Sequence, residues 1–172
     1  MGEYNSLALD AEGHPHISYW DRDLWALKYA YNDGSGWLTE TVDSAGYIVW
    51  SPTSLAVDSS GRPHITYCAC ASCTDCAELR HAWRDGGGWL TETVELHAGG
   101  ASLALDSSGR PHMAYVGRGG LCYGYYDGTT WITETVDWGG HGFYPPFPGP
   151  GRRRPAPHRL RRGVRAAGVR LL

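Results

Sequence analysis

Short apolar runs alternate with turn residues along the first 140 residues of the chain. In the first fifty residues the runs are five or six residues long and rich in β-branched and aromatic side chains. Gly, Asp, Asn or Pro bounds each run, a pattern that predicts β-strands. No stretch keeps the three-and-four apolar spacing of an amphipathic helix. We therefore expect strands at residues 6–10, 16–20, 27–31 and 37–42.

The same pattern occurs in three successive copies, and this repetition predicts the architecture. Ser6, Ser54 and Ser102 each begin a Ser-Leu-Ala-Leu/Val-Asp run, and successive copies start 48 residues apart. Such a period indicates a repeat protein, and four antiparallel strands per unit are typical of a β-propeller blade. We predict an all-β fold with an incomplete ring of about three blades. These occupy about residues 4–48, 52–98 and 100–140 within a repeat region at 1–144.

Each copy contains an aspartate followed by a glycine three residues later. The Asp side chain can cap its own turn, and Gly accepts a left-handed backbone, so we expect short hairpin loops there. The aspartates are Asp10, Asp58 and Asp106.

One histidine and one tryptophan also recur at fixed positions of each copy. Recurring histidines could converge on a metal or an anionic ligand near a ring axis. We favour a structural role for them, because a site normally breaks repeat symmetry whereas a requirement of the fold recurs. On this interpretation each imidazole is bonded to a neighbouring Ser, Thr or Asp, and each indole lies between blades with an N–H partner. The residues are His16, His64 and His112, and Trp37, Trp89 and Trp131.

Aromatic residues without counterparts in the other copies are better candidates for ligand binding. Trp20, Trp25 and Trp50 occur only in the first copy, beside loops or strand ends. An exposed indole next to Asp or Asn suits stacking on a sugar ring. We take these three residues as the candidate ligand site.

No set of catalytic residues stands out. The sequence lacks a nucleophile elbow, a His-Glu metal motif and a phosphate-binding glycine loop. Glu40, Glu92 and Glu134 recur in Thr-Glu-Thr, and we expect them on a solvated strand face. A glycosidase would need two carboxylates about 5–10 Å apart in one cleft. We assign no catalytic residue and no cofactor, and favour a protein that is not an enzyme.

Four cysteines fall within nine residues of the second copy only. Cys68, Cys70, Cys73 and Cys76 could form one or two local disulfides in an oxidising compartment. The alternative is a zinc or iron–sulfur site, because the last three are spaced much like a ferredoxin run. We favour disulfides. Cys122 lies alone on its strand, and we expect a small buried apolar side chain there.

The repeats are similar to bacterial propeller repeats related to the BNR or sialidase-type group, in which an Asp-box occupies one hairpin. The resemblance is carried by Asp33–Trp37, Asp85–Trp89 and Asp127–Trp131, and it covers residues 4–138. It implies a propeller fold and transfers no catalytic residue.

The composition changes abruptly after Tyr144. Residues 145–172 hold eight of the fifteen Lys and Arg residues and no acid, so the repeats carry seven bases against eighteen acids. An acidic body argues against nucleic-acid binding by the repeats. A disordered basic tail is one interpretation of 145–172. We favour an out-of-frame fourth repeat, because the same DNA shifted by one base can spell the repeat motif.

The sequence predicts a non-catalytic binding or scaffolding module of a larger, secreted bacterial repeat protein, with carbohydrate as its ligand. The alternatives are a fragment of a glycan-acting hydrolase or lyase, and a truncated frame without independent function. The chain has no signal peptide and no run long enough to span a bilayer. We expect it to be extracellular as part of a longer precursor. Open faces on the terminal blades predict self-association.

Overall fold

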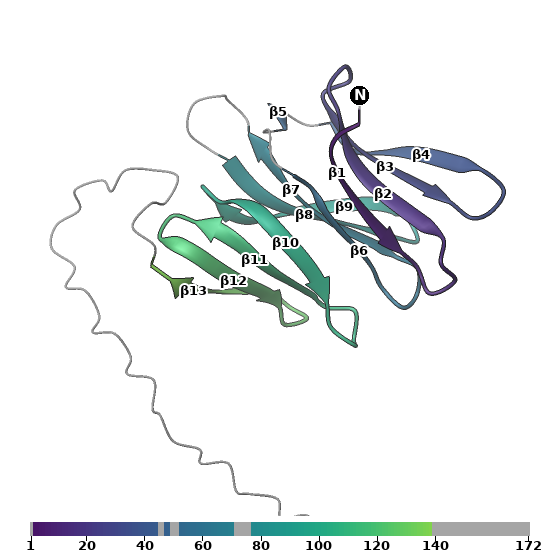
Figure 1. The fold of residues 1–172 in the computed structure, drawn as a ribbon. Coiled ribbons are helices and arrows are strands. Elements are labelled where there is room, and N and C mark those ends of the chain that lie inside the picture. Colours follow the sequence, from purple (N-terminus) through teal and green to yellow (C-terminus); the bar gives the residue numbers. More distant parts are fainter. Residues whose placement is uncertain (1, 45–46, 49–51, 71–76, 139–172) are drawn as a thin grey trace, which may run out of the picture.

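Three antiparallel sheets follow one another along the chain and lie side by side (Figure 1). The computed structural model describes residues 2–44, 47–48, 52–70 and 77–138. The predicted all-β fold of successive four-stranded units, each resembling a propeller blade, is confirmed. The predicted tail at 145–172 lies entirely outside the described part of the chain.

Each sheet is a simple meander in which consecutive strands pair. The first and third sheets each have four strands, in chain order. In the second sheet, the short β5 and β6 share the place of the first strand, because both pair with β7. The strands of the first sheet are β1 Glu3–Leu9, β2 Pro15–Asp21, β3 Ala26–Asn32 and β4 Trp37–Asp43. Those of the second are β5 Tyr47–Ile48, β6 Ser54–Val57, β7 Pro63–Cys70, β8 Ala77–Asp85 and β9 Gly88–Leu96. Those of the third are β10 Gly99–Leu105, β11 Pro111–Gly117, β12 Gly120–Tyr126 and β13 Trp131–Asp137.

The aspartate of each copy closes the hairpin between the first two long strands. In the first sheet, Asp10 Oδ1 accepts hydrogen bonds from the backbone N–H groups of Glu12 and His14, at 3.0 and 2.7 Å. Gly13 ends this turn with a φ of 87°, a conformation that a residue with a Cβ rarely adopts. The same loop recurs at Asp58 and Asp106.

The core lies between the sheets rather than within any one of them. Leu27 and Tyr29 of the first sheet form a buried cluster with Ile65 and Tyr67 of the second. A second cluster joins the second sheet to the third, and it includes Leu79, Met113 and Tyr115. Burying apolar side chains such as these is worth about 1.5–3 kcal/mol each. Each inner sheet face is therefore stable only against its neighbour.

Cys68 and Cys70 form no disulfide within the described residues, where both are buried. The two cysteines stand two positions apart on β7, so their Cα atoms are about 6.6 Å apart, at the upper limit for a bridge. Of the four cysteines for which one or two disulfides were predicted, these two are therefore not bonded to each other. Their other predicted partners, Cys73 and Cys76, lie outside the described part of the chain. Cys122 is buried, as expected for a small apolar side chain.

The described segments include no helix with the length and apolar character needed to cross a membrane.

Candidate ligand cleft between the first two sheets

The sheets are tied together by hydrogen bonds that recur at both inner junctions. The Trp89 indole donates to Glu40 Oε2 of the preceding sheet at 2.8 Å, and the Trp131 indole donates to Glu92 Oε1 at 2.8 Å. Our expectation that these glutamates lie on a solvated face was wrong for Glu40 and Glu92. The following sheet stacks on the face of β4 and of β9 that carries these glutamates, so polar positions of these strands become junction positions. No sheet precedes the first one among the described residues, and Trp37 is 52% exposed.

His16 and His64 face the junctions that follow their sheets, and His112 stands at the same position of the third sheet, which no described sheet follows. His16 Nδ1 contacts the Tyr29 hydroxyl, and His112 Nδ1 lies 2.6 Å from the Tyr123 hydroxyl. Asp10 Oδ2 is 3.4 Å from His16 Nε2. His112 Nε2 likewise lies 3.7 Å from Asp106 Oδ2. In these two copies the expected Asp partner is therefore present, together with a tyrosine that was not expected. Burial raises the pKa of the Tyr29 hydroxyl, which therefore stays protonated at physiological pH.

The second sheet departs from this arrangement, because a histidine replaces the tyrosine. His64 Nδ1 lies 3.1 Å from His81 Nε2, and the two rings stack at 5.2 Å. Burial, with the neighbouring His81, lowers the pKa of His64 to about 4. His81 Nδ1 in turn lies 3.1 Å from Glu92 Oε1. His64 is therefore uncharged at neutral pH.

A cleft of about 600 Å³ opens between the first and second sheets. One wall is aromatic: Tyr31 stacks on His16 with ring centroids 6.0 Å apart and an angle of 23°. The opposite wall comes from the second sheet and its hairpin loops, which bring two guanidinium groups and a carboxylate. The residues that line it are His16, Tyr29, Tyr31, Arg62, Arg84 and Asp85, together with Gly61, Pro63 and Gly86–Gly88.

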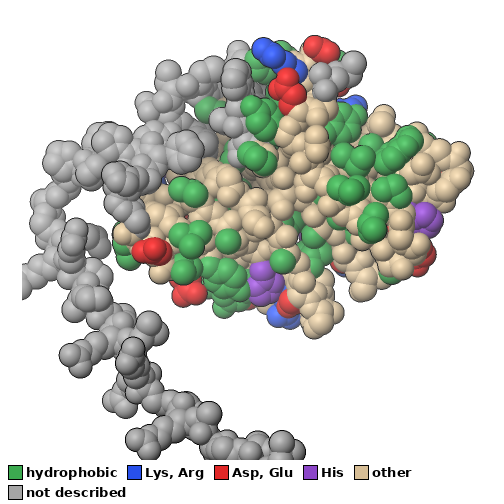
Figure 2. Space-filling view, viewed as in Figure 1, with side chains coloured by type: hydrophobic (Ala, Val, Ile, Leu, Met, Phe, Trp, Pro, Cys, Tyr) green, Lys and Arg blue, Asp and Glu red, His purple; other side chains and the backbone are tan. Residues whose placement is uncertain are grey.

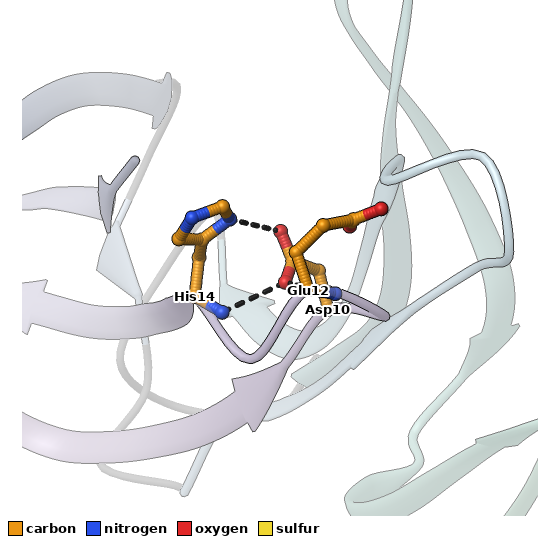
Figure 3. A group of neighbouring side chains, drawn as sticks. All are labelled: Asp10, Glu12 and His14. Carbon is orange, nitrogen blue, oxygen red and sulfur yellow. Dashed lines mark hydrogen bonds and ion pairs between the residues drawn. The ribbon is translucent and has the colours of Figure 1, made fainter. Parts of the chain in front are cut away.

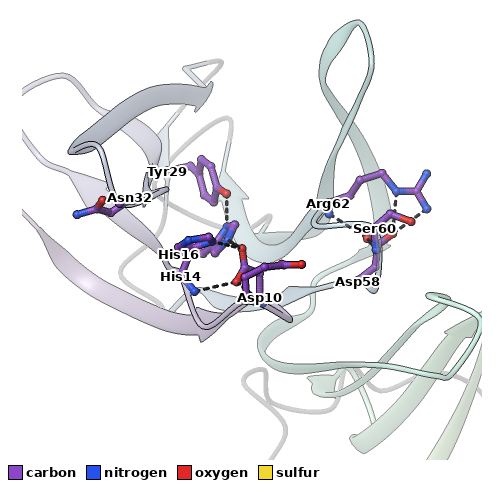
Figure 4. A network of polar contacts seen from close by, with 10 residues as sticks. Asp10, His14, His16, Tyr29, Asn32, Asp58, Ser60 and Arg62 are labelled. Carbon is purple, nitrogen blue, oxygen red and sulfur yellow. Dashed lines mark hydrogen bonds and ion pairs between the residues drawn. The ribbon is translucent and has the colours of Figure 1, made fainter.

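Ion pairs hold both arginines of the cleft in place. Arg62 binds Asp58 through Nε and Nη2, each 2.7 Å from Oδ2 (Figure 4). Burial raises the pKa of the Asp58 carboxyl, but the hydrogen bonds from Arg62 and Ser60 outweigh it and lower this pKa. Arg84 Nη2 lies 3.0 Å from Glu40 Oε1. Glu40 therefore accepts from both Arg84 and Trp89 of the next sheet.

The sequence pointed to other residues for ligand binding. Trp20 is buried at 4% exposure, and Trp25 is 48% exposed. Their rings meet edge to face at 6.1 Å and, with Glu3, Tyr4 and Arg22, line a separate cleft of about 520 Å³. Trp50 lies outside the described residues.

Sequence reasoning missed the polar members of the cleft between the sheets. Neither Arg62, whose side chain is 57% exposed, nor Arg84 was among the candidate ligand-binding residues. The second of these, Arg84, could have been found. Its repeat position varies, with Asn32 in the first copy and Tyr126 in the third. That variation is the signal that could have found it, since the same criterion selected the unmatched tryptophans.

Asp10, Glu12 and His14 form one further cluster, with ligand atoms within 4.8 Å of one another. Figure 3 shows the Glu12 carboxylate turned away from the His14 ring. Desolvation raises the pKa of the Asp10 carboxyl, but hydrogen bonds from His14 and His16 bring it down to about 2. In the next sheet, Arg62 occupies the position of His14 and binds the equivalent aspartate. The Asp10 carboxylate therefore stabilises the turn, and within the turn its side-chain partner is His14.

No protein-family model and no curated protein matches this sequence. Solved structures do. A fucose lectin from Kordia zhangzhouensis in complex with methyl-fucoside aligns with a TM-score of 0.51 and 18% identity, over 76% of this chain and 96% of that one. A protein of unknown function from Dyadobacter fermentans gives 0.56 and 14%, over 77% and 41%. Aleuria aurantia lectin in complex with Fucα1-6GlcNAc gives 0.48 and 16%, over 77% and 47%. The chain thus spans less than half of the last two proteins. At these identities the likeness shows the fold alone: three sheets that resemble the blades of propeller lectins.

Proposed function

We propose that the chain is a non-catalytic carbohydrate-binding module and that the cleft between the first two sheets holds the sugar. The observation that carries the proposal is the composition of this cleft. It combines a stacked aromatic wall at His16 and Tyr31 with two anchored guanidinium groups, from Arg62 and Arg84, and the Asp85 carboxylate. The volume of about 600 Å³ lies in the range of small-molecule sites.

These groups match the chemistry of a pyranose. The C–H face of a sugar packs on aromatic rings, while its hydroxyls need donors and acceptors in fixed directions. Arg carries five N–H donors in a rigid fork, and a carboxylate accepts only. Asp58 and Glu40 hold the two arginines, so a ligand pays little side-chain entropy to use the remaining donors. The fold adds support, because the Kordia zhangzhouensis protein of similar fold is a fucose lectin.

The carboxylates at the cleft favour binding over hydrolysis. Glu40 is occupied by Arg84 and Trp89, and Asp58 by Arg62 and its own turn. The hydrogen bonds from Arg62 and Ser60 lower the pKa of Asp58 and hold it as an anion, whereas a glycosidase needs one carboxyl group kept protonated. As the sequence predicts, we place this module within a larger secreted repeat protein.

The exposed Trp25 marks a second surface where the same ligand class could bind. Its cleft also contains Arg22 and Glu3, whose charged groups are 3.9 Å apart. That long, exposed pair fixes its partners less firmly than the two arginine pairs above. We therefore rank this surface second.

Glycan-array screening of the full chain, followed by titration calorimetry with methyl-fucoside and the best array ligand, tests the proposal. Arg84→Ala should weaken binding about tenfold or more, since a hydrogen bond to a charged group is worth about 1.5–3 kcal/mol. Arg22→Ala is the matched control and should leave the affinity unchanged. Loss in the control alone would move the site to Trp25. A chain that binds no glycan on the array, or that releases product from a model glycoside, would contradict the proposal.

A further inference from the structure

The outer face of the first sheet exposes side chains that the inner sheets bury. Leu7 on β1 is 63% exposed, whereas Leu55 and Leu103, at the same register of the later sheets, are 6% and 9% exposed. Ile17 and Trp37 line a shallow hollow on the same face. Figure 2 shows hydrophobic side chains gathered over this sheet. We call this surface the first-sheet outer face.

The opposite end of the stack exposes the complementary set. Leu121 on β12 is 45% exposed, whereas its counterparts Leu27 and Leu79 are both 0% exposed. Val136 on β13 is 59% exposed, while Val42 at the equivalent position is 8% exposed. We call this surface the third-sheet outer face. The third-sheet outer face therefore corresponds to the face that an inner junction takes from its earlier sheet. The first-sheet outer face corresponds to the face that it takes from its later sheet.

Three kinds of hydrogen bond recur at both inner junctions, and in each of them the earlier sheet accepts. The first is the indole–glutamate bond described above. In the second, Ser6 Oγ and Ser54 Oγ accept from the N–H groups of Leu55 and Leu103, at 3.1 and 3.0 Å. In the third, a tyrosine hydroxyl donates to a carboxylate at the end of the preceding sheet. The pairs are Tyr67 with Asp43 and Tyr115 with Glu95.

The acceptors of a further junction stand on the third-sheet outer face. Strand register places Ser102, Glu134 and Asp137 where the earlier sheets carry their accepting side chains. Within the described residues, no hydrogen bond is formed by these three side chains.

The matching donors stand on the first-sheet outer face. Register places the Leu7 N–H, the Tyr19 hydroxyl and the Trp37 indole where the later sheets carry their donors. In the part of the chain that the structure describes, neither the Tyr19 hydroxyl nor the Trp37 indole forms a hydrogen bond.

We propose that a second copy of this chain docks head to tail, with its first-sheet outer face against the third-sheet outer face. Its Leu7, Tyr19 and Trp37 then donate to Ser102, Asp137 and Glu134, as at the inner junctions. A head-to-tail contact closes into a ring when the rotation between units permits. Propellers have about four to eight blades. Six is the one multiple of three in that range, so two copies close the ring and cover both outer faces.

One consequence rests on the proposed function. Tyr123 and Tyr125 stack at 5.9 Å and 29° on the third-sheet outer face, close to the 5.8 Å and 25° of Tyr29 and Tyr31. The docked copy would therefore complete another cleft with a similar aromatic wall. Sedimentation measures the ring without any glycan, so the two proposals fail independently.

Sedimentation velocity of the full chain, with single-face variants, tests the docking. The wild-type chain should sediment at twice its monomer mass. Leu7→Arg and Leu121→Arg should each give single copies, because each one damages both junctions of a two-copy ring. An equimolar mixture of these variants should regain a two-copy species, since one of its junctions then joins two undamaged faces. Leu24→Arg is the control and should stay at twice the monomer mass, because Leu24 is 62% exposed in a hairpin loop.

Other outcomes overturn the proposal. A wild-type chain that remains a single copy across the accessible concentration range would mean that something else covers the faces, such as residues 139–172 or further repeats of the larger protein proposed above. Loss of the two-copy species in only one of the two variants would indicate a symmetric face-to-face dimer. Glu134→Lys gives an independent check, because it alters an exposed carboxylate and no buried contact. It should also yield single copies, with an unchanged circular dichroism spectrum.

Discussion

Two junctions hold the three sheets together, one between the first and second sheets and one between the second and third. They share the same hydrogen bonds between sheets and differ in the polar side chains around those bonds. Both have an indole–glutamate bond of 2.8 Å and a serine that accepts from a leucine N–H. In the first junction Glu40 also binds Arg84, whereas in the second Glu92 contacts His81. The shared hydrogen bonds thus fix how the sheets stack, while the other polar side chains at each junction differ.

The variation decides which junction has a cleft with cations. Tyr126 stands where the second sheet has Arg84, and its ring packs on Trp131 at 5.7 Å. An aromatic ring here adds contact area but offers no guanidinium donors to a ligand. The repeat therefore supplies the scaffold, and departures from the repeat supply the chemistry.

The largest expected effect on stability comes from removing a tryptophan whose indole bonds to the neighbouring sheet. Trp89→Ala removes a ring that packs on Tyr29 at 5.1 Å and donates to Glu40. The free energy of unfolding should fall by about 3 kcal/mol, the lower end for a large aromatic residue, because Trp89 is half-buried. Trp131→Ala should cost a similar amount if the two junctions are equivalent. Urea denaturation at a concentration where the chain is a single copy measures both.

Trp37→Ala is the matched control for these two variants. Trp37 occupies the same repeat position but is 52% exposed, so its loss should change the free energy of unfolding by less than about 0.5 kcal/mol. An equal loss in all three variants would show that the indole matters to its own sheet and not to the junction.

The next effect sharpens the difference between the junctions. Because the pKa of His64 is lowered from 6.5 to about 4, the unfolded chain binds a proton there that the folded chain excludes. Stability should therefore fall as the pH drops from about 6.5 to 4, by about 3 kcal/mol. Urea midpoints across this range measure the change. His64→Gln should flatten this part of the profile. A profile that stays equally steep in His64→Gln would assign the titration to another group.

Because of the repeat, much of the fold could be predicted from the sequence. The residues of the candidate cleft could not be predicted in the same way. Strand alternation and the Asp–Gly hairpins, as at Asp10 and Gly13, needed only local rules. The role of Glu40 could not be read this way, since alternation shows that it shares a face with Val42 but not what covers that face. Arg84 depends on two sheets meeting, which no local pattern encodes. Comparing the copies position by position is the step that recovers such residues.

The smallest expected effect concerns one hydroxyl that the second junction leaves unpaired. At the first junction, Ser18 Oγ and Thr53 Oγ1 are 2.7 Å apart. Thr66, at the position of Ser18 in the second sheet, is 1% exposed, and its Oγ1 has no partner among the described residues. The third sheet carries Ala101 where the second has Thr53, so the partner hydroxyl is missing.

Ala101→Thr should supply that partner and make the second junction like the first. A net gain of about 1 kcal/mol in the free energy of unfolding is expected, because a buried unpaired hydroxyl is costly and Thr suits a strand. Ala101→Val has a nearly identical shape without the hydroxyl, so it separates packing from hydrogen bonding. Thr53→Ala should lose about the same 1 kcal/mol at the first junction. Urea unfolding of the three variants decides the matter: an equal gain from Val and Thr would show that the junction lacked volume rather than a hydrogen bond.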